Sequence, residues 1–318
     1  MRKRTRVIVV LSLVAALGGG AAPAQAVGTI AAPTVRDGRI AFVRGGQIFT
    51  IHSDGTGERQ LTKRGNNSRP VWSPNGQRIS FLREVAGLRD LWVMGDNGEH
   101  ARQITTDHAA TGASWSPDGG QLVVGNPLRT ISSTAPFTTI KVLTGAAFEG
   151  GEPFPLAVSG TSPPMWSPDG RWIAFVSPSY PDSPDLFLLV LDLSASVVYE
   201  WDGIGGSCCG EGTFAEPTWS ADGAILAYTI ARAPLGGHVP PTVTASTFPA
   251  HTAKTFATLP HDRQLDFSPS GRRAVGVNDK GGNPVIFISD PGGSGRKSLT
   301  KGIQPNWQPR PDLALTSS

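Results

Sequence analysis

Residues 70–76 read Pro-Val-Trp-Ser-Pro-Asn-Gly, and much of this phrase returns along the chain. Its aromatic residue recurs at steps of 43, 51, 53, 48 and 40 residues, and the last copy is a remnant, Trp-Gln-Pro. A repeat with a period of about 40–50 residues is typical of propellers and solenoids, in which each copy is one supersecondary unit. The aromatic residues that open the copies are Trp72, Trp115, Trp166, Trp219, Phe267 and Trp307.

One copy contains four short strand-like runs separated by turn signals. Within residues 70–107 these runs lie at 70–72, 78–82, 90–94 and 102–105. Four such runs in succession predict one four-stranded antiparallel sheet, which is the blade of a propeller. The Ser-Pro-Asp-Gly turn fits a hairpin, because its Pro sets φ for a type I turn and its Gly takes a left-handed conformation.

The two ends of the chain complete the count of blades. The run at 39–43 matches the second run of a copy, and the run at 304–309 matches a first run. Pairing them would complete a sixth blade and remove two free sheet edges. We therefore predict an all-β fold, a six-bladed β-propeller whose C-terminal strand joins the N-terminal strands; an open twisted sheet or stacked sandwiches are the alternatives. Third runs are expected at 47–51, 139–143, 186–190, 243–247 and 285–288.

The aromatic residue of each first run is expected to pack between neighbouring blades, where one Trp buries about 150–250 Å². Stacking platforms for a sugar are the alternative. A position that repeats in every blade favours architecture over a binding site.

Residues 1–26 have the composition of an export signal. Basic residues within 2–6 precede an apolar run at 7–17, and residues 24–26 read Ala-Gln-Ala, which fits a cleavage site. The apolar run is short for a membrane span. An uncleaved N-terminal anchor is the alternative.

The charge balance changes without that segment. The chain has 28 Lys and Arg against 25 Asp and Glu, and four basic but no acidic residues lie in the first 26 positions. A nearly neutral remainder lacks the basic stripe that nucleic acid requires, so we expect no nucleic-acid partner. We expect a linker at 27–37, the propeller at 38–309, a tail at 310–318, and a monomer in the periplasm or outside the cell with no membrane span after cleavage.

The repeat resembles the WD40-like PD40 repeat of the TolB-type propellers. The family pattern is P-x-W-S-P-D-G followed by I-A-F, I-Y-V-M and R-x-L-T strands; residues 70–105 match it, and partial copies span 38–309. The resemblance implies an exported propeller that acts as a protein-binding platform next to the cell envelope. TolB carries an α/β domain before its propeller and prolyl oligopeptidases append a hydrolase domain, whereas here we expect a propeller alone.

Connectivity assigns the loops to two sides of the ring. Loops after the first and third runs share one side and are short, whereas loops after the second and fourth runs share the other side. We call these the short-turn side and the long-loop side. Because long, variable loops on a rigid scaffold usually carry function, we expect the site on the long-loop side, around the mouth of the channel. Its long connections lie at 125–138, 177–184, 202–217 and 230–241.

The loop at 202–217 holds the only two cysteines, Cys208 and Cys209. Thiols of an exported protein are readily oxidised. Adjacent cysteines can close a strained vicinal disulfide, which flanking glycines would help the backbone to tolerate. Two inert surface thiols or an intermolecular bridge are the alternatives.

Further candidate binding residues fall in connections of the long-loop side: His108, Glu216, His238, His261 and Asp262. Converging imidazoles and carboxylates could hold a divalent cation, but no ligand spacing marks such a site. Solvated loop residues are the alternative, and we expect no cofactor.

No catalytic signature accompanies the repeat, since the sequence lacks a G-x-S-x-G elbow for a serine nucleophile. We therefore expect a non-enzymatic exported propeller that binds a protein or cell-envelope component. The alternatives are a metal-assisted hydrolase or lyase acting on a sugar or lactone, and a redox-tuned adaptor that uses the two cysteines.

Overall fold

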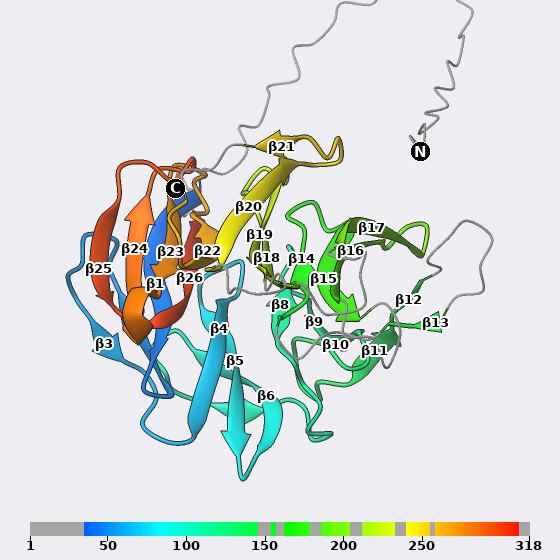
Figure 1. Ribbon diagram of the computed structural model, residues 1–318. Helices are drawn as coiled ribbons and strands as arrows, with labels where there is room; N and C mark the ends of the chain where they lie inside the picture. Colours follow the sequence, from blue (N-terminus) through cyan, green and yellow to red (C-terminus); the bar gives the residue numbers. More distant parts are fainter. Residues whose placement is uncertain are drawn as a thin grey trace, which may run out of the picture. The chain divides into compact units, whose positions relative to one another are not determined.

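The computed structural model describes residues 35–145, 154–156, 162–178, 186–203, 212–232, 240–254 and 258–311. They form six four-stranded antiparallel sheets, which are the blades of a propeller ring, and one two-stranded sheet (Figure 1). The predicted six-bladed, all-β fold is confirmed. The predicted export signal lies outside the described residues. Within those residues the one helical element is the 3-10 turn η1 (Lys280–Gly282), and no helix could cross a membrane.

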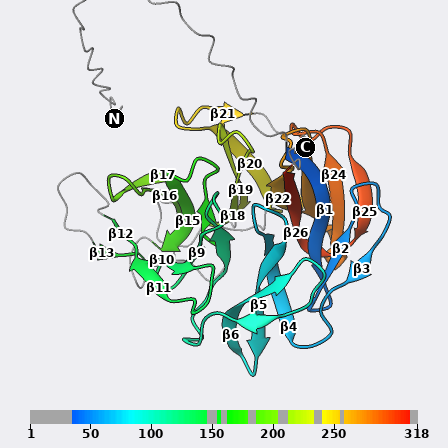
Figure 2. The same ribbon diagram turned by 180° about the vertical axis from the view of Figure 1, so that it is seen from behind.

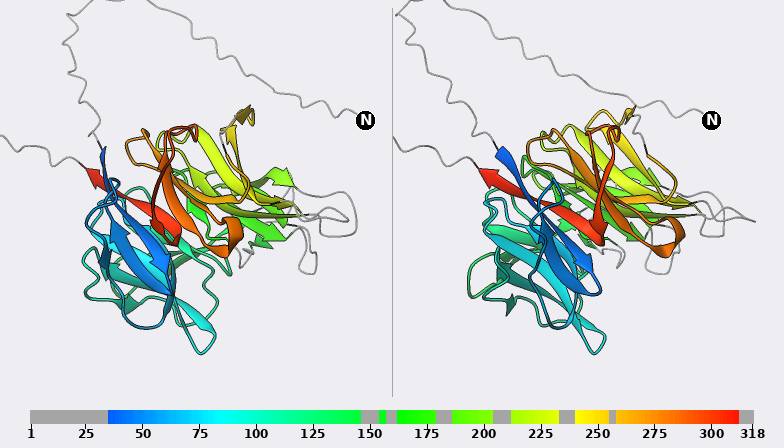
Figure 3. Two further views of the ribbon diagram at one scale, coloured as in Figure 1. Left: turned by 60° about the vertical axis from the view of Figure 1, so that its left-hand side comes forward. Right: turned by 90° about the vertical axis from the view of Figure 1, so that its left-hand side faces the viewer.

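Blade 1 joins the two ends of the described chain. The C-terminal strand β26 (Ile303–Pro311) pairs with β1 (Val35–Arg44), followed by β2 (Gln47–Ile51) and β3 (Arg59–Gln60). Figure 3 shows β26 in red beside β1 in blue. The predicted closure is therefore confirmed, with Trp307 of the last motif copy opposite Ile40.

The other blades follow in chain order around the ring (Figure 2). Blade 2 contains β4 (Asn66–Trp72), β5 (Arg78–Val85), β6 (Leu88–Gly95) and β7 (Arg102–Gln103). Blade 3 contains β8 (Ala113–Trp115), β9 (Gln121–Val124), β10 (Arg129–Ser132) and β11 (Thr139–Val142). Blade 4 contains β14 (Met165–Trp166), β15 (Trp172–Pro178), β16 (Leu186–Asp192) and β17 (Val197–Gly203). Blade 5 contains β18 (Gly212–Trp219), β19 (Ile225–Arg232), β20 (Thr242–Thr247) and β21 (Ala253–Lys254). Blade 6 contains β22 (Asp262–Phe267), β23 (Ala274–Asn278), β24 (Val285–Ser289) and β25 (Lys297–Lys301). The small sheet pairs β12 (Thr144–Gly145) with β13 (Phe154–Pro155).

Blade 3 corrects one part of the sequence analysis. The run expected as its third strand is β11, the fourth strand, and the third strand is β10. The connection expected at 125–138 is therefore a turn, a strand and a second loop. Residues 133–138 follow a third strand and so belong to the short-turn side.

The repeated turn has the geometry that its residues predict. In blade 2 the Gly76 N–H donates to the Ser73 carbonyl at 2.8 Å, and Gly76 has a φ of 68°. The Ser73 hydroxyl accepts the Arg78 N–H at 2.9 Å and donates to Asn75 at 2.7 Å. The left-handed glycine recurs in the four other full copies, with φ between 69° and 76°. The prediction of a left-handed Gly is confirmed.

The motif aromatics pack between blades. Each of six apolar clusters joins two neighbouring blades, and each contains the motif aromatic of the later blade. Trp72, for example, lies with Ile48 of blade 1 and Phe81 of blade 2. The indole N–H of Trp115 also donates to the Val71 carbonyl of the preceding blade at 3.1 Å. The expected architectural role of this residue is thus confirmed.

Candidate functional site

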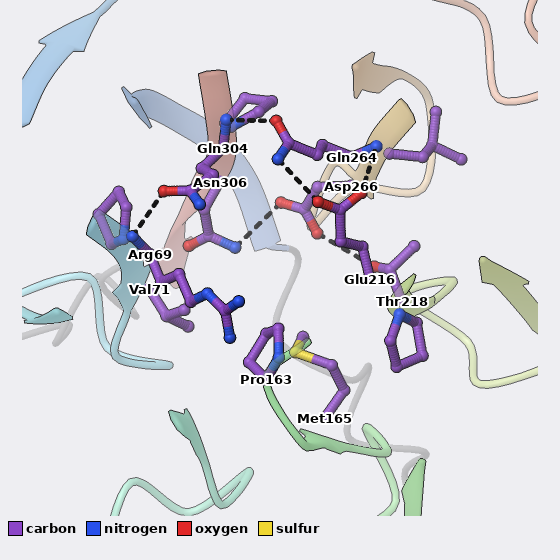
Figure 4. A pocket seen from close by; sticks show the side chains of 14 residues that line it. Arg69, Val71, Pro163, Met165, Glu216, Thr218, Gln264, Asp266, Gln304 and Asn306 are labelled. Atoms are coloured by element: carbon purple, nitrogen blue, oxygen red, sulfur yellow. Dashed lines mark hydrogen bonds between the residues drawn. The ribbon is translucent and has the colours of Figure 1, made fainter. Parts of the chain in front are cut away.

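The first strands of five blades line a central cavity of about 80 Å³ (Figure 4). The space suits a few water molecules or a small ion, and it is far below the ~300–1,000 Å³ of pockets that enclose drug-sized ligands. Two positions of the repeat supply most of the lining. The upstream position, three residues before the motif aromatic, is Arg69, Pro163, Glu216, Gln264 and Gln304 in these blades. The adjacent position, one residue before it, is Val71, Met165, Thr218, Asp266 and Asn306.

A β-bulge directs the upstream side chains to the cavity. The register of the first strand shifts around this position in blades 2, 5 and 6. The backbone is left-handed there, with φ of 53°, 59°, 56° and 55° at Arg69, Glu216, Gln264 and Gln304. This conformation costs about 1–2 kcal/mol for a residue with a Cβ. Its recurrence at equivalent positions indicates that other contacts offset the strain.

Hydrogen bonds between blades provide those contacts. Glu216 accepts the backbone N–H of Gln264 at 3.0 Å and its Nε2–H at 2.7 Å. Gln264 Oε1 accepts the backbone N–H of Gln304 at 2.8 Å. Gln304 Oε1 accepts the backbone N–H of Arg69 at 2.8 Å. We call this chain, which crosses blades 5, 6, 1 and 2, the upstream belt; it satisfies three backbone donors that the bulges leave unpaired.

The adjacent position links blades in the same way. Asn306 Oδ1 accepts the backbone N–H of Trp72 at 2.8 Å, which joins blade 1 to blade 2. Ser114 Oγ accepts the backbone N–H of Trp166 at 2.8 Å, which joins blade 3 to blade 4. The motif aromatic is therefore held by its backbone as well as by its ring.

Asp266 is the centre of this second set of bonds. Its Oδ2 accepts the Trp307 backbone N–H at 2.8 Å and Asn306 Nδ2–H at 3.1 Å, both from blade 1. The Thr218 hydroxyl of blade 5 lies 3.3 Å from Oδ1. One carboxyl of blade 6 thus contacts both neighbouring blades, beside the strand that closes the ring.

The opposite wall of the cavity lacks the upstream belt. The upstream positions of blades 3 and 4 are Gly112 and Pro163, neither of which has a side chain that can form hydrogen bonds. There Arg69 of blade 2 reaches across, and its Nη1 donates to the carbonyl of Thr111 in blade 3. Met165 and other apolar side chains complete this wall. The cavity therefore has one face of carboxyls and carboxamides and one apolar face that carries a guanidinium.

Burial shifts the ionisation of the cavity groups. It raises the pKa of Asp266 to about 7, and it also raises the pKa of Glu216 against the opposing effects of Gln264 and of nearby arginines. Burial lowers the pKa of Arg69 to about 10. Shifted carboxyls in a cavity are often functional. Here, however, their oxygens accept bonds from the next blade, which is a structural use.

The candidate residues named from sequence belong to separate contacts. His108 Nδ1 lies 2.7 Å from Asp90 Oδ2, with the His108 side chain 46% exposed and that of Asp90 only 7% exposed. Glu216 lies in β18 and Asp262 in β22, so both belong to first strands rather than to loops. His261 precedes β22, and its backbone N–H donates to the Pro241 carbonyl at 2.9 Å.

Asp262 is occupied by contacts within blade 6. It accepts the Leu259 backbone N–H at 2.7 Å and Asn278 Nδ2–H at 2.8 Å, and it pairs with Arg296. The guanidinium of Arg296 stacks on Phe287 at 3.7 Å. These contacts give Asp262 a role in the blade core.

The remaining candidates, Cys208, Cys209 and His238, lie outside the described residues. Within the described part of the chain, no three His, Cys, Asp or Glu side chains form a group that could hold a metal ion. The cation hypothesis includes His238, so it stays a prediction, as does the vicinal disulfide.

Of the candidate binding residues named from sequence, Glu216 alone lines the cavity, and it was expected in a loop; the other lining residues were not among those candidates. The available signal was the tetrapeptide that ends in each motif aromatic: Arg-Pro-Val-Trp at 69–72, Glu-Pro-Thr-Trp at 216–219, Gln-Leu-Asp-Phe at 264–267 and Gln-Pro-Asn-Trp at 304–307. Polar residues that recur at the first and third places of a buried strand indicate a shared polar interior.

Most of the exposed large apolar side chains lie on the long-loop side. Among the described residues the exposed large hydrophobics are Val85 at 62%, Leu88 at 49%, Val142 at 41%, Leu259 at 53% and Tyr199 at 48%. Val85 and Leu88 face each other at the tip of the β5–β6 hairpin, which follows a second strand. Val142 ends a fourth strand, and Leu259 follows another. Only Tyr199 lies elsewhere, on the outermost strand of blade 4.

Comparisons with known proteins agree with the fold. No family model matches the chain. The Tol-Pal system protein TolB of Zymomonas mobilis is 35% identical over 75 residues, which cover 23% of this chain and 16% of that protein. Dipeptidyl-peptidase 5 of Porphyromonas endodontalis is 32% identical over 101 residues, which cover 31% of this chain and 14% of that protein. The chain thus spans about a sixth of the length of these curated relatives.

A solved structure extends the likeness to the ring. TolB from Acinetobacter baumannii matches with a TM-score of 0.65 at 19% identity, over 85% of this chain and 66% of that chain. At this identity the match shows the fold. The chain therefore has a propeller fold like that of TolB, and its repeat resembles the PD40 repeat.

Proposed function

We propose that this chain is an exported, non-enzymatic propeller that binds a protein or a cell-envelope component through its long-loop side. The observation that carries the proposal is the likeness to TolB, in repeat sequence and in the ring. That relative is named as a protein of the Tol-Pal system. Export is supported by the basic, apolar and Ala-Gln-Ala segments of residues 1–26.

The central cavity supports a scaffold role. The polar groups of Glu216, Asp266 and Asn306 hold neighbouring blades together. A ring tied at its centre keeps the loops of its two sides in fixed positions, as a binding platform requires.

The exposed apolar side chains support the choice of side. Val85, Leu88 and Leu259 present apolar surface to solvent from two blades, and each lies on the long-loop side. Val85 and Leu88 are cross-strand neighbours, and adjacent exposed apolar side chains favour protein contact. The long-loop side therefore combines variable connections with apolar contact points.

Capture from an envelope extract of the source organism tests the proposal. The full chain is immobilised beside a variant carrying Val85→Glu, Leu88→Glu and Leu259→Glu. The control carries Ala101→Glu and Ala250→Glu, which change exposed alanines that follow third strands on the short-turn side. We expect the wild type and the control to capture one component saturably and stoichiometrically. The variant with three Glu substitutions should bind that component at least tenfold more weakly.

Equal binding to all three proteins would contradict the assignment to the long-loop side. A turnover activity with one divalent ion per chain, lost when His108, His238 and His261 are changed to Ala, would instead establish the metal-assisted hydrolase or lyase.

A further inference from the structure

The six blades end in outermost strands of very different length. Three of them have two residues each: β3, β7 and β21. Strand β11 has four residues and carries Lys141, and β25 has five residues with a Lys at each end. Strand β17 has seven residues, Val-Val-Tyr-Glu-Trp-Asp-Gly, and carries neither Lys nor Arg.

This difference matters because an outermost strand presents unpaired backbone N–H and C=O groups. Proteins protect such edges by keeping them short or by placing charged side chains, above all Lys, on them. Five blades of this ring show one or both of these protections. Blade 4 has neither a short outermost strand nor a Lys on it, its exposed charge being Glu200, and within the described residues β17 pairs only with β16.

The edge of β17 is held rigidly by its inward side chains. Val198 and Trp201 are buried, at 4% and 7% exposure. The Trp201 indole donates to Ser246 Oγ at 3.0 Å, and Asp202 accepts the Tyr228 hydroxyl at 2.7 Å. Pairing with β16 is regular from Val197 to Glu200 and shifts register beyond that point. The first four residues therefore form a regularly paired template, next to the anchored residues Trp201 and Asp202.

The exposed side chains of this template, which lie on opposite faces of the strand, define a chemistry. Tyr199 is 48% exposed, and its ring lies 6.1 Å from that of Trp172, edge to face. Glu200 is also exposed. The nearby cation Arg171 is paired with the buried carboxylate of Asp192 at 2.7 Å. The edge thus offers one aromatic contact followed by one acidic contact.

We propose that β17 accepts an extended segment of a partner protein as an added fifth strand of blade 4. The segment carries an apolar residue opposite Tyr199 and Lys or Arg opposite Glu200, because cross-strand pairs of these kinds stabilise an antiparallel sheet. A second copy of this strand brings no cation to Glu200, so the charge favours a basic partner. This surface lies on the rim of the ring and is independent of the proposed long-loop site.

A synthetic peptide tests the inference. The probe is Thr-Lys-Val-Lys-Val-Lys-Val-Lys-Thr with a fluorescent label, and the control peptide has Glu in place of every Lys. Each is titrated against the full chain by anisotropy at low salt, and hydrogen exchange is measured across 197–203. We expect the Lys peptide to bind at least tenfold more tightly than the Glu peptide and to slow exchange in 197–200.

Variants locate the binding. The double variant Tyr199→Lys, Glu200→Lys places lysines on β17, as the outermost strands β11 and β25 already have. We expect it to lose at least tenfold of its affinity for the Lys peptide. Ser298→Lys in β25 is the control: it adds one positive charge to another outermost strand, against a net change of three in the β17 variant, and we expect it to keep the affinity. Unchanged affinity in the β17 variant, or equal binding of both peptides, overturns the proposal. A dimer in sedimentation that the β17 variant abolishes also overturns it, because the occupant would then be a second copy.

Discussion

Replacing Asp266 with Asn removes the ionisable group beside the closing strand. The Asn carboxamide can still accept the Trp307 N–H, and its NH₂ can donate to the Thr218 hydroxyl, which now lies 3.3 Å from the carboxyl. The change therefore keeps these two hydrogen bonds while it removes the charge. Its effect on the free energy of unfolding isolates the ionisation of this one carboxyl.

The expected pH dependence follows from the raised pKa. Asp266 titrates near 3.8 when unfolded and at about 7 when folded. Between these values the folded chain binds the additional proton, so the wild type loses stability as pH rises. At about 1.36 kcal/mol per unit over roughly three units, the loss is at most about 4 kcal/mol, and water in the cavity reduces it. The Asn variant has no ionisable group at this position, so its stability does not fall with pH for this reason.

Denaturant unfolding followed by tryptophan fluorescence from pH 4 to 8.5 measures the effect. We expect equal stabilities near pH 4 and a more stable Asn variant at pH 8. Asp118→Asn is the opposing control: a hydrogen bond from Ser116 lowers the pKa of Asp118, so that carboxylate stabilises the fold at neutral pH and less so as pH falls. A stability difference between wild type and Asp266→Asn that does not change with pH would refute the reasoning.

Three further predictions concern the ring. Glu216→Ala removes the acceptor of Gln264 Nε2–H and leaves the Gln264 backbone N–H only the longer contact to Thr229 Oγ1 at 3.3 Å; it should lower the free energy of unfolding by about 1–3 kcal/mol, whereas Glu216→Gln keeps an acceptor and should cost less, as measured by denaturant unfolding. Gly76→Ala should destabilise more than Gly119→Ala, because both glycines are left-handed but only a Cβ on Gly76 would overlap the backbone of β26; thermal unfolding compares the two. Trp219→Ala should cost about 3–5 kcal/mol and speed hydrogen exchange in β15 and β19, since the ring fills the core between blades 4 and 5.

The repeat predicted the architecture because each of its features has a local structural cause. The period is the length of one blade, the turn closes a hairpin, and the aromatic residue packs between blades. Blade 3 was misassigned because β10 reads Arg-Thr-Ile-Ser, a short run without a strong apolar alternation, whereas β11 reads Thr-Ile-Lys-Val and looked like a third strand. Pairing with β9 makes β10 the third strand, and a segment this short does not reveal its pairing partner in the sequence.

The cavity could not be predicted for a different reason. Glu216 and Asp262 were assigned to loops because the first run was taken to begin only two residues before the motif aromatic, as at 70–72. A bulge at the upstream position turns Glu216 inward, where Gln264 of the next blade contacts it. The bulge depends on the match between neighbouring strands and blades, which one sequence does not reveal. The loops named as the site fall largely outside the described residues, so that part stays a prediction.

Hydrogen exchange of the full chain with and without its captured component locates the surface that the component covers. Binding through the long-loop side predicts slowed exchange at segments of that side, including 61–65, 85–88, 104–112 and 279–284, and unchanged exchange at the short-turn-side segments 73–77, 116–120 and 220–224. Protection confined to the short turns would show that the component binds the opposite side.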